Sequence, residues 1–332
     1  MRTGVRKSGG NAIALPPIGF GGGSAFCSVG EDEAARLLSY ACASGFRYFD
    51  TAPFYGQGLS ELRFGATLRG LPRGSFLLSS KAGRLLTRSP AAAAPGKLPF
   101  EVVYDYSYDG VMRSLEDSWK RLGMDRIDIV YLHDCSPTWR KERFEDDFRT
   151  AVQGGYRALD ELRSAGTIGA IGVGIKDWEI CLRFARAVDL DLVMLAGGYT
   201  LLDHASLEEF LPYCSQNGIA VVLASPFNSG ILAVGSSAAA TYSYQPPPPG
   251  ILERVRRLEA VCGRHRVPLG AAAIQFPLGH RAITTIVAGF TRKSEVDTNL
   301  AWLRMPVPPD LWSELKSEGL LPAHAPVPED VA

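Results

Sequence analysis

The chain has 332 residues, and 35 Lys plus Arg balance 35 Asp plus Glu. A net charge near zero argues against polyanion binding as the main task, so we expect no nucleic-acid partner and no strongly charged membrane face. The length suggests about two domains as a prior, but α/β barrels routinely exceed about 250 residues as one domain.

Cysteine usage and the N-terminus indicate a cytoplasmic protein. Six cysteines are scattered without a CxxC or a metal-ligand spacing, which is typical of reduced, buried thiols. Residues 1–11 are basic and glycine-rich with no apolar run behind them, so we expect no signal peptide. The uncharged stretch 210–252 is interrupted by Gly, Asn, Ser and four consecutive prolines, so we expect it not to cross a membrane.

Short apolar strands alternate with helices of 3.6-residue periodicity along the whole chain. The strands lack strict alternation, as expected when both faces are covered. The predicted strand–helix pairs are 18–21 with 31–44, 46–49 with 59–69, 76–80 with 107–122, 127–132 with 155–165, 168–173 with 178–187, 190–195 with 207–216, 219–223 with 251–266 and then 269–278, and 283–287 with 294–302.

Eight such units without a composition break predict a (β/α)8 TIM barrel, and we expect residues 1–332 to form one barrel domain. A doubly wound sheet is the alternative, and it is disfavoured because no GxGxxG fingerprint opens a first βα turn. The run Gly19-Phe-Gly-Gly-Gly23 shows neither a helix start after it nor an acid at the usual distance. We interpret it as a tight turn at the barrel mouth.

Two long loops follow predicted strands. Residues 87–99 contain an alanine run and three prolines, and residues 235–250 end in the proline run. Loops that leave the C-terminal ends of barrel strands lie over the active-site face. We therefore interpret both loops as pocket walls or lids rather than as flexible linkers.

Ionisable side chains stand at the C-terminal ends of three predicted strands. These are Asp50, Lys81 and His133, and Tyr55 follows in the loop after Asp50. Catalytic residues of a barrel belong at such strand ends. A phenol has an ordinary pKa of about 10, and a nearby ammonium lowers it, so Lys81 would favour the phenolate of Tyr55. Asp50 would hold Lys81, and His133 would bind a substrate oxygen.

Each of these residues has an ordinary structural explanation when taken alone. An Asp at a strand end often caps the next helix, a Lys is usually exposed, and a His is usually a satisfied polar group. The four residues together at such positions favour general acid–base chemistry at a carbonyl or alcohol carbon.

The chain resembles the aldo-keto reductase superfamily over nearly its whole length. The resemblance lies in Gly45-Phe-Arg-Tyr-Phe-Asp50-Thr-Ala-Pro-Phe-Tyr55-Gly, Leu78-Ser-Ser-Lys81, Ser114-Leu-Glu-Asp-Ser-Trp-Lys-Arg-Leu-Gly-Met-Asp-Arg-Ile-Asp128 and Leu132-His133. It implies that Asp50, Tyr55, Lys81 and His133 are the catalytic tetrad of that family.

Within the superfamily the chain is most similar to the aldose 1-dehydrogenase branch, which includes L-fucose, D-threo-aldose and pyridoxal 4-dehydrogenases. Supporting segments are Tyr106-Ser-Tyr-Asp-Gly-Val-Met-Arg-Ser114, Gly197-Gly-Tyr-Thr-Leu-Leu-Asp203, Pro226-Phe-Asn-Ser-Gly-Ile-Leu232 and Leu311-Trp-Ser-Glu-Leu-Lys-Ser-Glu-Gly-Leu-Leu321. The resemblance implies oxidation of an aldose at its anomeric carbon to a lactone. A pyridoxal 4-dehydrogenase is the alternative.

The resemblance also implies a nicotinamide cofactor bound without a Rossmann domain. A pyrophosphate loop would follow the seventh strand, and an adenosine-binding segment would lie at the eighth, with a phosphate at a helix N-terminus. The implied cofactor residues are Lys176, Ser225, Phe227, Asn228, Ser229, Gly230, Leu232, Gly289, Thr291, Arg292, Glu295 and Asn299.

We expect NAD rather than NADP, because the carboxylate of Glu295 would repel a 2′-phosphate and accept hydrogen bonds from ribose hydroxyls. Arg292 and Lys293 lie close enough to compensate, so NADP stays open. After the fifth strand the family often has Ser-Asn, whereas this chain has Lys176-Asp177. One of these two residues, or the backbone, takes that place at the nicotinamide.

The substrate wall is predicted from barrel position to include Phe54, Tyr106, Cys135 and Trp139, together with Phe227. We expect a small sugar or aldehyde as substrate, no metal, and a monomer or small homo-oligomer. Three rival functions stay open at this point: an NADPH-dependent aldehyde or ketone reductase, a cofactor-binding regulatory subunit, and a metal-dependent hydrolase. An intact tetrad argues against the second. The third would need clustered His and acids at strand ends, yet the chain has five His in all.

Overall fold

Residues 13–328 are described by a computed structural model of the chain. The segment 1–11, on which the absence of a signal peptide was predicted, lies outside these residues. The central feature is a closed parallel barrel with strand order β1-β10-β9-β8-β7-β6-β3-β2. Its strands are β1 (Ile18–Gly21), β2 (Tyr48–Asp50), β3 (Leu77–Ala82), β6 (Ile127–His133), β7 (Ile168–Ile175), β8 (Leu192–Ala196), β9 (Ala220–Ala224) and β10 (Ile283–Gly289).

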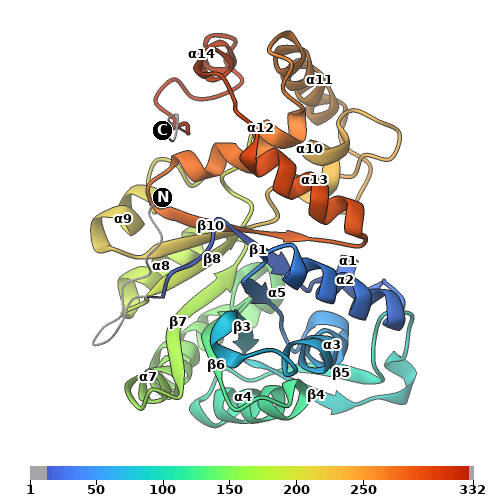
Figure 1. The fold of residues 1–332 in the computed structure, drawn as a ribbon. Coiled ribbons are helices and arrows are strands. Elements are labelled where there is room, and N and C mark those ends of the chain that lie inside the picture. Colours follow the sequence, from blue (N-terminus) through green and yellow to red (C-terminus); the bar gives the residue numbers. More distant parts are fainter. Residues whose placement is uncertain (1–12, 329–332) are drawn as a thin grey trace.

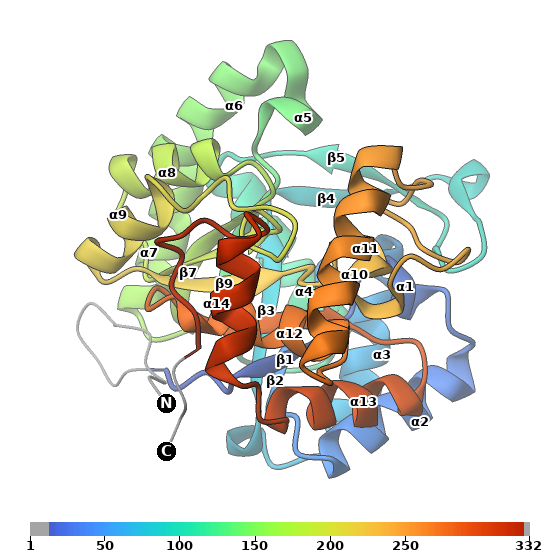
Figure 2. The same ribbon diagram turned by 90° about the horizontal axis from the view of Figure 1, so that it is seen from above.

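Helices surround the barrel, as Figures 1 and 2 show from two directions. They are α1 (Ser24–Cys27), α2 (Glu31–Ala43), α3 (Leu59–Leu68), α4 (Tyr108–Leu122), α5 (Pro137–Arg140), α6 (Phe144–Thr150), α7 (Tyr156–Ser164), α8 (Trp178–Ala187), α9 (Phe210–Asn217), α10 (Ile231–Val234), α11 (Pro249–Arg264), α12 (Leu269–Gln275), α13 (Lys293–Arg304) and α14 (Pro309–Ser317). The (β/α)8 TIM barrel predicted from the sequence is therefore confirmed.

The core has two layers because successive residues of a strand point to opposite faces. In β6, Ile129 and Tyr131 belong to a small cluster that fills the barrel interior. Their neighbours Val130 and Leu132 belong to the large cluster between strands and helices. The same alternation points His133 inward at the end of the strand, which places a polar side chain at the barrel mouth.

Two sequence predictions about glycines are wrong. A one-turn helix, α1, begins directly after Gly23, where no helix start was predicted. The helix predicted for 155–165 is also longer, since α6 continues through a π-helical segment, Ala151–Gly155, into α7. Gly154 and Gly155 do not break this helix. A Cβ on Gly155 would lie 2.7 Å from the carbonyl oxygen of Tyr106, so glycine allows a close helix contact there.

The loop predicted for 87–99 is bounded by a two-stranded antiparallel ribbon, β4 (Arg84–Arg88) and β5 (Phe100–Tyr104). The ribbon follows β3 directly and lies near α5 in Figure 2, where Arg140 Cζ of α5 is 4.0 Å from the centroid of the Tyr104 ring of β5. The connection between its two strands contacts the loop after β2, where Leu98 N donates to the carbonyl oxygen of Gly56 at 3.0 Å. Gly56 has φ of +62°, and a Cβ there would lie 2.7 Å from the carbonyl oxygen of Gly96.

Among the described residues, no helix is both long enough and apolar enough to span a bilayer.

Candidate active site

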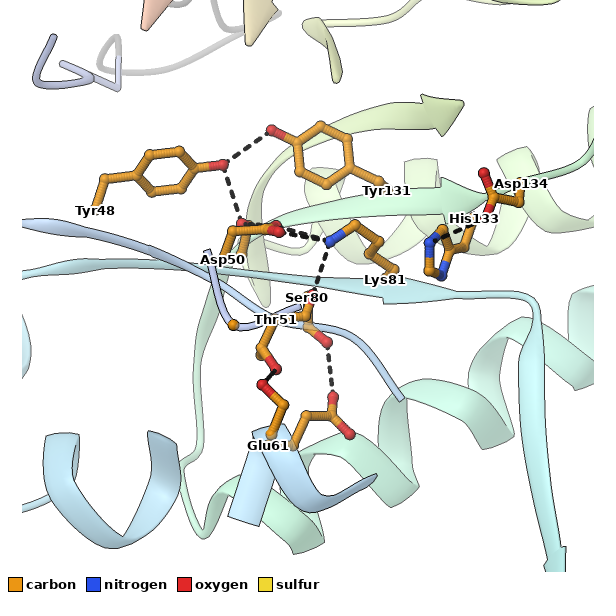
Figure 3. Close-up of polar contacts among 12 residues, drawn as sticks. Tyr48, Asp50, Thr51, Glu61, Ser80, Lys81, Tyr131, His133 and Asp134 are labelled. Atoms are coloured by element: carbon orange, nitrogen blue, oxygen red, sulfur yellow. Dashed lines mark hydrogen bonds and ion pairs between the residues drawn. The ribbon is translucent and has the colours of Figure 1, made fainter. Parts of the chain in front are cut away.

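A buried ion pair joins the ends of β2 and β3. Lys81 Nζ donates to Asp50 Oδ2 at 2.7 Å and Oδ1 at 2.9 Å, and to the carbonyl oxygen of Thr51 at 2.9 Å. The two side chains are 2% and 3% exposed. Burial opposes the charge of Lys81, but Asp50 and Tyr55 outweigh burial and hold the pKa of Lys81 above its ordinary value. The ammonium is therefore fixed in place and charged at neutral pH (Figure 3).

A chain of hydroxyls supports Asp50 from inside the barrel. Ser79 Oγ donates to Asp50 Oδ1 at 2.6 Å. Tyr48 Oη lies 3.0 Å from Ser79 Oγ and 3.2 Å from Tyr131 Oη, and all three hydroxyl-bearing residues are fully buried. Sequence reasoning missed Ser79. A signal was present, because Ser79 lies two residues before Lys81 and so on the same face of the strand.

Tyr55 lies against the ammonium of Lys81 and the imidazole of His133. Lys81 Nζ is 4.6 Å from the centroid of the phenol ring, and the centroid of the His133 ring is 5.8 Å away. Burial raises the pKa of Tyr55 to about 12, although the charge of Lys81 lowers it. The effect of Lys81 thus has the predicted direction. The pKa of Tyr55 nevertheless lies above the ordinary value of a phenol, because desolvation is the larger effect.

His133 is a neutral hydrogen-bonding group in this environment. Burial, reinforced by the charges of Arg84 and Lys81, holds the pKa of His133 well below its ordinary value. Its Nδ1 is buried with no hydrogen-bond partner among residues 13–328. Tyr106 Oη donates to the carbonyl oxygen of His133 at 2.8 Å and fixes the end of β6.

Of the predicted wall residues, Phe54 packs against His133 of the tetrad, and Trp139 packs against Phe54. The Phe54 ring centroid lies 6.1 Å from that of His133 and 5.7 Å from that of Trp139. Tyr106 and Cys135 are buried, at 2% and 0% exposure. The position of these two residues on a substrate wall stays a prediction. The hydroxyl of Tyr106 binds the backbone of β6, at the carbonyl oxygen of His133.

The segment after β9 has the backbone form of an anion-binding concavity. Ser225, Asn228, Ser229 and Gly230 have φ values of +59°, +47°, +64° and +109°. Such left-handed residues among right-handed ones turn successive N–H groups toward one side. Asn228 Oδ1 is buried without a partner in the described part of the chain. Leu232 is buried behind this segment, and Phe227 packs at a centroid distance of 6.0 Å on Trp302 of α13.

The loop 235–250 contacts the same segment, because Thr241 Oγ1 donates to the carbonyl oxygen of Ser229 at 2.6 Å. That contact places the loop where a lid would need to be. Its role as a lid stays a prediction.

The segment between β10 and α13 is organised by Glu295. Its Oε2 accepts from Thr291 N at 2.7 Å, and its Oε1 lies 3.2 Å from Arg292 Nε. Asn299 Nδ2 donates to the carbonyl oxygen of Glu295 at 2.8 Å, but Asn299 Oδ1 is buried and has no partner within residues 13–328. Gly289, at the end of β10, is exposed beside this segment.

Lys176 directly follows β7 and has an exposed side chain. The neighbouring Asp177 Oδ2 accepts from Thr138 Oγ1 at 3.1 Å. The contact of Lys176 with a nicotinamide stays a prediction. Among the described residues, no group of three or more His, Cys, Asp or Glu is arranged to hold a metal ion.

The arrangement has the parts of a proton-transfer site. One phenol lies between a fixed ammonium and a neutral imidazole, and all of these groups meet at the C-terminal ends of barrel strands. The unpartnered amide oxygens of Asn228 and Asn299 lie in the segment after β9 and on α13 after β10, where a second molecule would find hydrogen-bond acceptors.

Comparison with known proteins gives the family. The model of the Aldo/keto reductase family matches residues 17–318. The chain belongs to the aldo/keto reductase family. Among curated proteins, this aldo/keto reductase is 39% identical to pyridoxal 4-dehydrogenase of Microbacterium luteolum over 95% of its length and 97% of the relative's. It is also 39% identical to D-threo-aldose 1-dehydrogenase of a Pseudomonas species, covering 93% of this chain and 96% of that one.

Solved structures share the fold of this aldo/keto reductase. The holo form of an aldo-keto reductase from Bacillus halodurans superimposes with a TM-score of 0.75 at 23% identity, covering 99% of each chain. A glycerol dehydrogenase from Gluconobacter oxydans gives 0.75 at 19% identity, covering 99% of this chain and 98% of that one.

Membership makes the chain an NAD(P)-dependent oxidoreductase, since aldo/keto reductases use nicotinamide cofactors. The residues present fit such a group. Asn228 Oδ1 in the left-handed run after β9 and Asn299 Oδ1 on α13 are unpartnered within residues 13–328, and the second offers an acceptor for an adenine amino group.

Proposed function

We propose that the protein is an NAD-dependent aldose 1-dehydrogenase of the L-fucose or D-threo-aldose type, which oxidises the anomeric carbon of a cyclic aldose to a lactone. The observation that carries the proposal is the placement of Tyr55 against Lys81 and His133. The relative named D-threo-aldose 1-dehydrogenase, similar over nearly the full length, supports the substrate class.

In this function Tyr55 accepts the proton of the anomeric hydroxyl, and His133 binds the oxygen that carries it. The nicotinamide ring, when bound, supplies the hydride acceptor. Lys81 favours the phenolate form of Tyr55 by its charge, and Asp50 keeps Lys81 at a fixed position. In the reverse direction Tyr55 donates the same proton to a carbonyl oxygen, with His133 as the second donor.

Three side chains support NAD over NADP. Glu295 places a carboxylate at the N-terminus of α13, where a 2′-phosphate would be repelled. Arg292 Nε is paired with that carboxylate at 3.2 Å. Lys293 Nζ lies 5.3 Å from the centroid of the Tyr40 ring. Both cations that would compensate for Glu295 therefore have partners within the protein.

Pyridoxal is the second candidate substrate, because a relative named pyridoxal 4-dehydrogenase has the same identity to this chain. The aromatic pair Phe54 and Trp139 suits either substrate, since such rings pack on the C–H face of a sugar or on a pyridine ring.

A substrate panel decides between the candidates. Aldoses, pyridoxal and simple aldehydes are tested with NAD and with NADP, and nicotinamide absorbance is followed in both directions. We expect the highest kcat/KM for an aldose with NAD. Highest activity with pyridoxal would replace the aldose by the second candidate. Activity only in the reducing direction with NADPH would contradict the proposal.

A further inference from the structure

A second charged pair lies beside the tetrad and takes no part in the chemistry described above. Arg84, the first residue of β4, donates from Nη2 to Asp134 Oδ2 at 2.6 Å. Asp134 directly follows His133. The side chain of Arg84 is fully buried, whereas that of Asp134 is 16% exposed. Asp134 is therefore the member of the pair that an arriving molecule would meet.

The backbone of Asp134 is held in an uncommon conformation. Its φ is +48°, in the left-handed region that non-glycine residues seldom occupy. The amide of Asp134 donates to the carbonyl oxygen of Gly174 at 3.0 Å, which ties this residue to the end of β7. Backbone strain of this kind is found where a side chain must point in one fixed direction.

The carboxylate of Asp134 adjoins the oxygen-binding nitrogen of His133. Asp134 Oδ2 lies 3.4 Å from His133 Nε2, and the two side chains lie together in Figure 3. Asp134 Oδ1 makes no hydrogen bond to any residue in the range 13–328. If a substrate oxygen binds His133 Nε2, the hydroxyl on the neighbouring substrate carbon lies beside the Asp134 carboxylate. There Asp134 Oδ1 can accept its hydrogen bond.

The guanidinium of Arg84 is enclosed by aromatic rings. Its Cζ lies 4.2 Å from the Phe54 centroid, 4.8 Å from that of Trp139 and 5.0 Å from that of Tyr104. Nε and Nη1 of Arg84 have no hydrogen-bond partner among the described residues. A buried pair of this kind is not an optimum for stability, because unsatisfied buried donors are costly.

We propose that Asp134 is a specificity-determining residue that accepts a hydrogen bond from the hydroxyl on the carbon next to the reacting carbon, and that Arg84 is the positioning residue behind it. This inference rests on the proposed function and goes beyond it by naming the substrate class. That class consists of 2-oxygenated aldehydes and hemiacetals. An aldose with its C2 hydroxyl belongs to it. Pyridoxal does not, because its ring hydroxyl lies one carbon further from the aldehyde carbon.

Arg84 acts through the charge and direction of Asp134. Burial raises the pKa of Asp134, and Arg84 and Lys81 oppose that rise. Seven charged or titratable groups of the described residues interact with Asp134: Arg84 of β4, Lys81 of β3, His133 of β6, Asp177 after β7, Tyr55 after β2, Tyr106 after β5 and Cys181 of α8. Loss of Arg84 would favour the protonated carboxyl, which accepts hydrogen bonds less well.

The test compares L-fucose with 2-deoxy-L-fucose, using the intact protein, NAD and kcat/KM. Each sugar is measured with the wild type and Asp134→Asn, so that the intrinsic reactivities of the sugars cancel. We expect Asp134→Asn to lower the preference for L-fucose by roughly ten- to hundredfold, as for one hydrogen bond to a charged group. The rate with the 2-deoxy sugar should fall by a smaller factor than the rate with L-fucose, because the 2-deoxy sugar has no C2 hydroxyl for Asp134 to bind. An equal loss on both sugars, or no loss on either, would overturn the proposal.

Asp147→Asn is the matched control. Asp147 pairs with Arg140, whose Cζ lies 4.0 Å from the centroid of the same Tyr104 ring. This second pair is also largely enclosed, with side chains 11% and 13% exposed, but neither residue is within ion-pair distance of His133. Its variant should therefore keep the wild-type sugar preference. A loss of preference in Asp147→Asn as large as in Asp134→Asn would count against the proposal.

The variant Arg84→Gln tests the positioning role through the pH dependence of the sugar preference, which a purely structural role of Arg84 would not change. It also replaces Asp134→Asn as the test if that variant does not fold. We expect its preference for L-fucose to be weak at neutral pH and to recover as pH rises, because Asp134 then ionises. Arg84→Lys should keep part of the preference at neutral pH. A preference in Arg84→Gln that does not vary with pH would overturn the positioning role.

If the wild type oxidises neither aldoses nor pyridoxal with either cofactor, the proposed function itself fails. Oxidation of both sugars with a preference that Asp134→Asn leaves unchanged overturns only the second-oxygen site.

Discussion

The two sides of the barrel mouth differ in how fully their polar groups are paired. At the ends of β2 and β3, Asp50 and Lys81 find partners in each other, in Ser79 and in Thr51. In the segment after β9 and on α13 after β10, Asn228 and Asn299 keep buried side-chain oxygens without partners in the described part of the chain.

This difference separates two tasks. Proton transfer requires charges that are already oriented, and the protein supplies all of those on the β2–β3 side. Binding a large cofactor requires groups that become satisfied only when the cofactor arrives, and such groups are costly until then. Substitutions on the first side should therefore affect turnover, and those on the second side should affect cofactor affinity.

The largest effect is expected for Tyr55→Phe. Removal of one phenolic oxygen removes the proton-transferring group, so kcat should fall by about 10³-fold, within the range for general acid–base catalysis. The dissociation constant of NADH, measured by fluorescence, should stay within about twofold. Near-wild-type turnover would show that Tyr55 is not the proton-transferring group.

Lys81→Met should cost both activity and stability. It leaves Asp50 buried without its counter-charge, for which a loss of about 3–5 kcal/mol in the free energy of unfolding is expected. The double variant Asp50→Asn with Lys81→Met removes both charges and should recover much of that stability in denaturant unfolding. Turnover should stay low in the double variant, because Tyr55 has lost the ammonium. Recovery of turnover together with stability would argue against an electrostatic role for Lys81.

Asn299→Ala should weaken cofactor binding without slowing the chemistry. The dissociation constant of NADH should rise roughly five- to tenfold, as for one hydrogen bond, and kcat at saturation should change less than about twofold. Asn217→Ala is the control, because Asn217 makes the same hydrogen bond to the carbonyl four residues earlier, at 2.9 Å, on α9. Equal affinities for NADH in the two variants would contradict the division between the two sides.

The smallest effect is expected for Ser79→Ala. Loss of the 2.6 Å hydrogen bond to Asp50 should lower kcat only a few-fold, because Lys81 still holds the carboxylate. A stability loss of about 1 kcal/mol should accompany it. Ser206→Ala removes a similar buried hydrogen bond, to the carbonyl oxygen of Gly198 at 2.9 Å, and should lower stability without changing kcat. Identical kinetics for both variants would remove Ser79 from the support of Asp50.

The barrel and the place of the tetrad could be predicted because both depend on local patterns. Each strand is a short apolar run, and Asp50, Lys81 and His133 mark where three of these runs end. In a parallel barrel all strand ends of one kind meet on one face, so the order of residues along the chain was enough to bring them together.

Features that depend on contacts between distant segments could not be predicted. Gly154 and Gly155 resembled a helix start, and only the proximity of the Tyr106 carbonyl shows why glycine is needed inside a helix. The elevated pKa of Tyr55 was missed for a similar reason. A sequence shows that a lysine is near, but the burial that outweighs its charge comes from rings packed around the phenol.

Arg84 is a residue of the site whose burial and contacts could not be predicted from the sequence. In the sequence it is one arginine in a ribbon, with nothing to mark it as buried. Its contacts come from Asp134, fifty residues later in the chain, and from the rings of Phe54, Trp139 and Tyr104.

The central claim is that one phenol, Tyr55, transfers the proton in both directions. The most direct test is the pH dependence of the rate of each direction at saturating cofactor. Oxidation needs the phenolate and should accelerate as pH rises through the alkaline range, since burial raises the pKa of Tyr55 to about 12. Reduction needs the phenol, so its rate should stay level over that interval and fall only as pH approaches the pKa of Tyr55. Parallel pH profiles for oxidation and reduction, or different profiles that persist in Tyr55→Phe, would contradict the account.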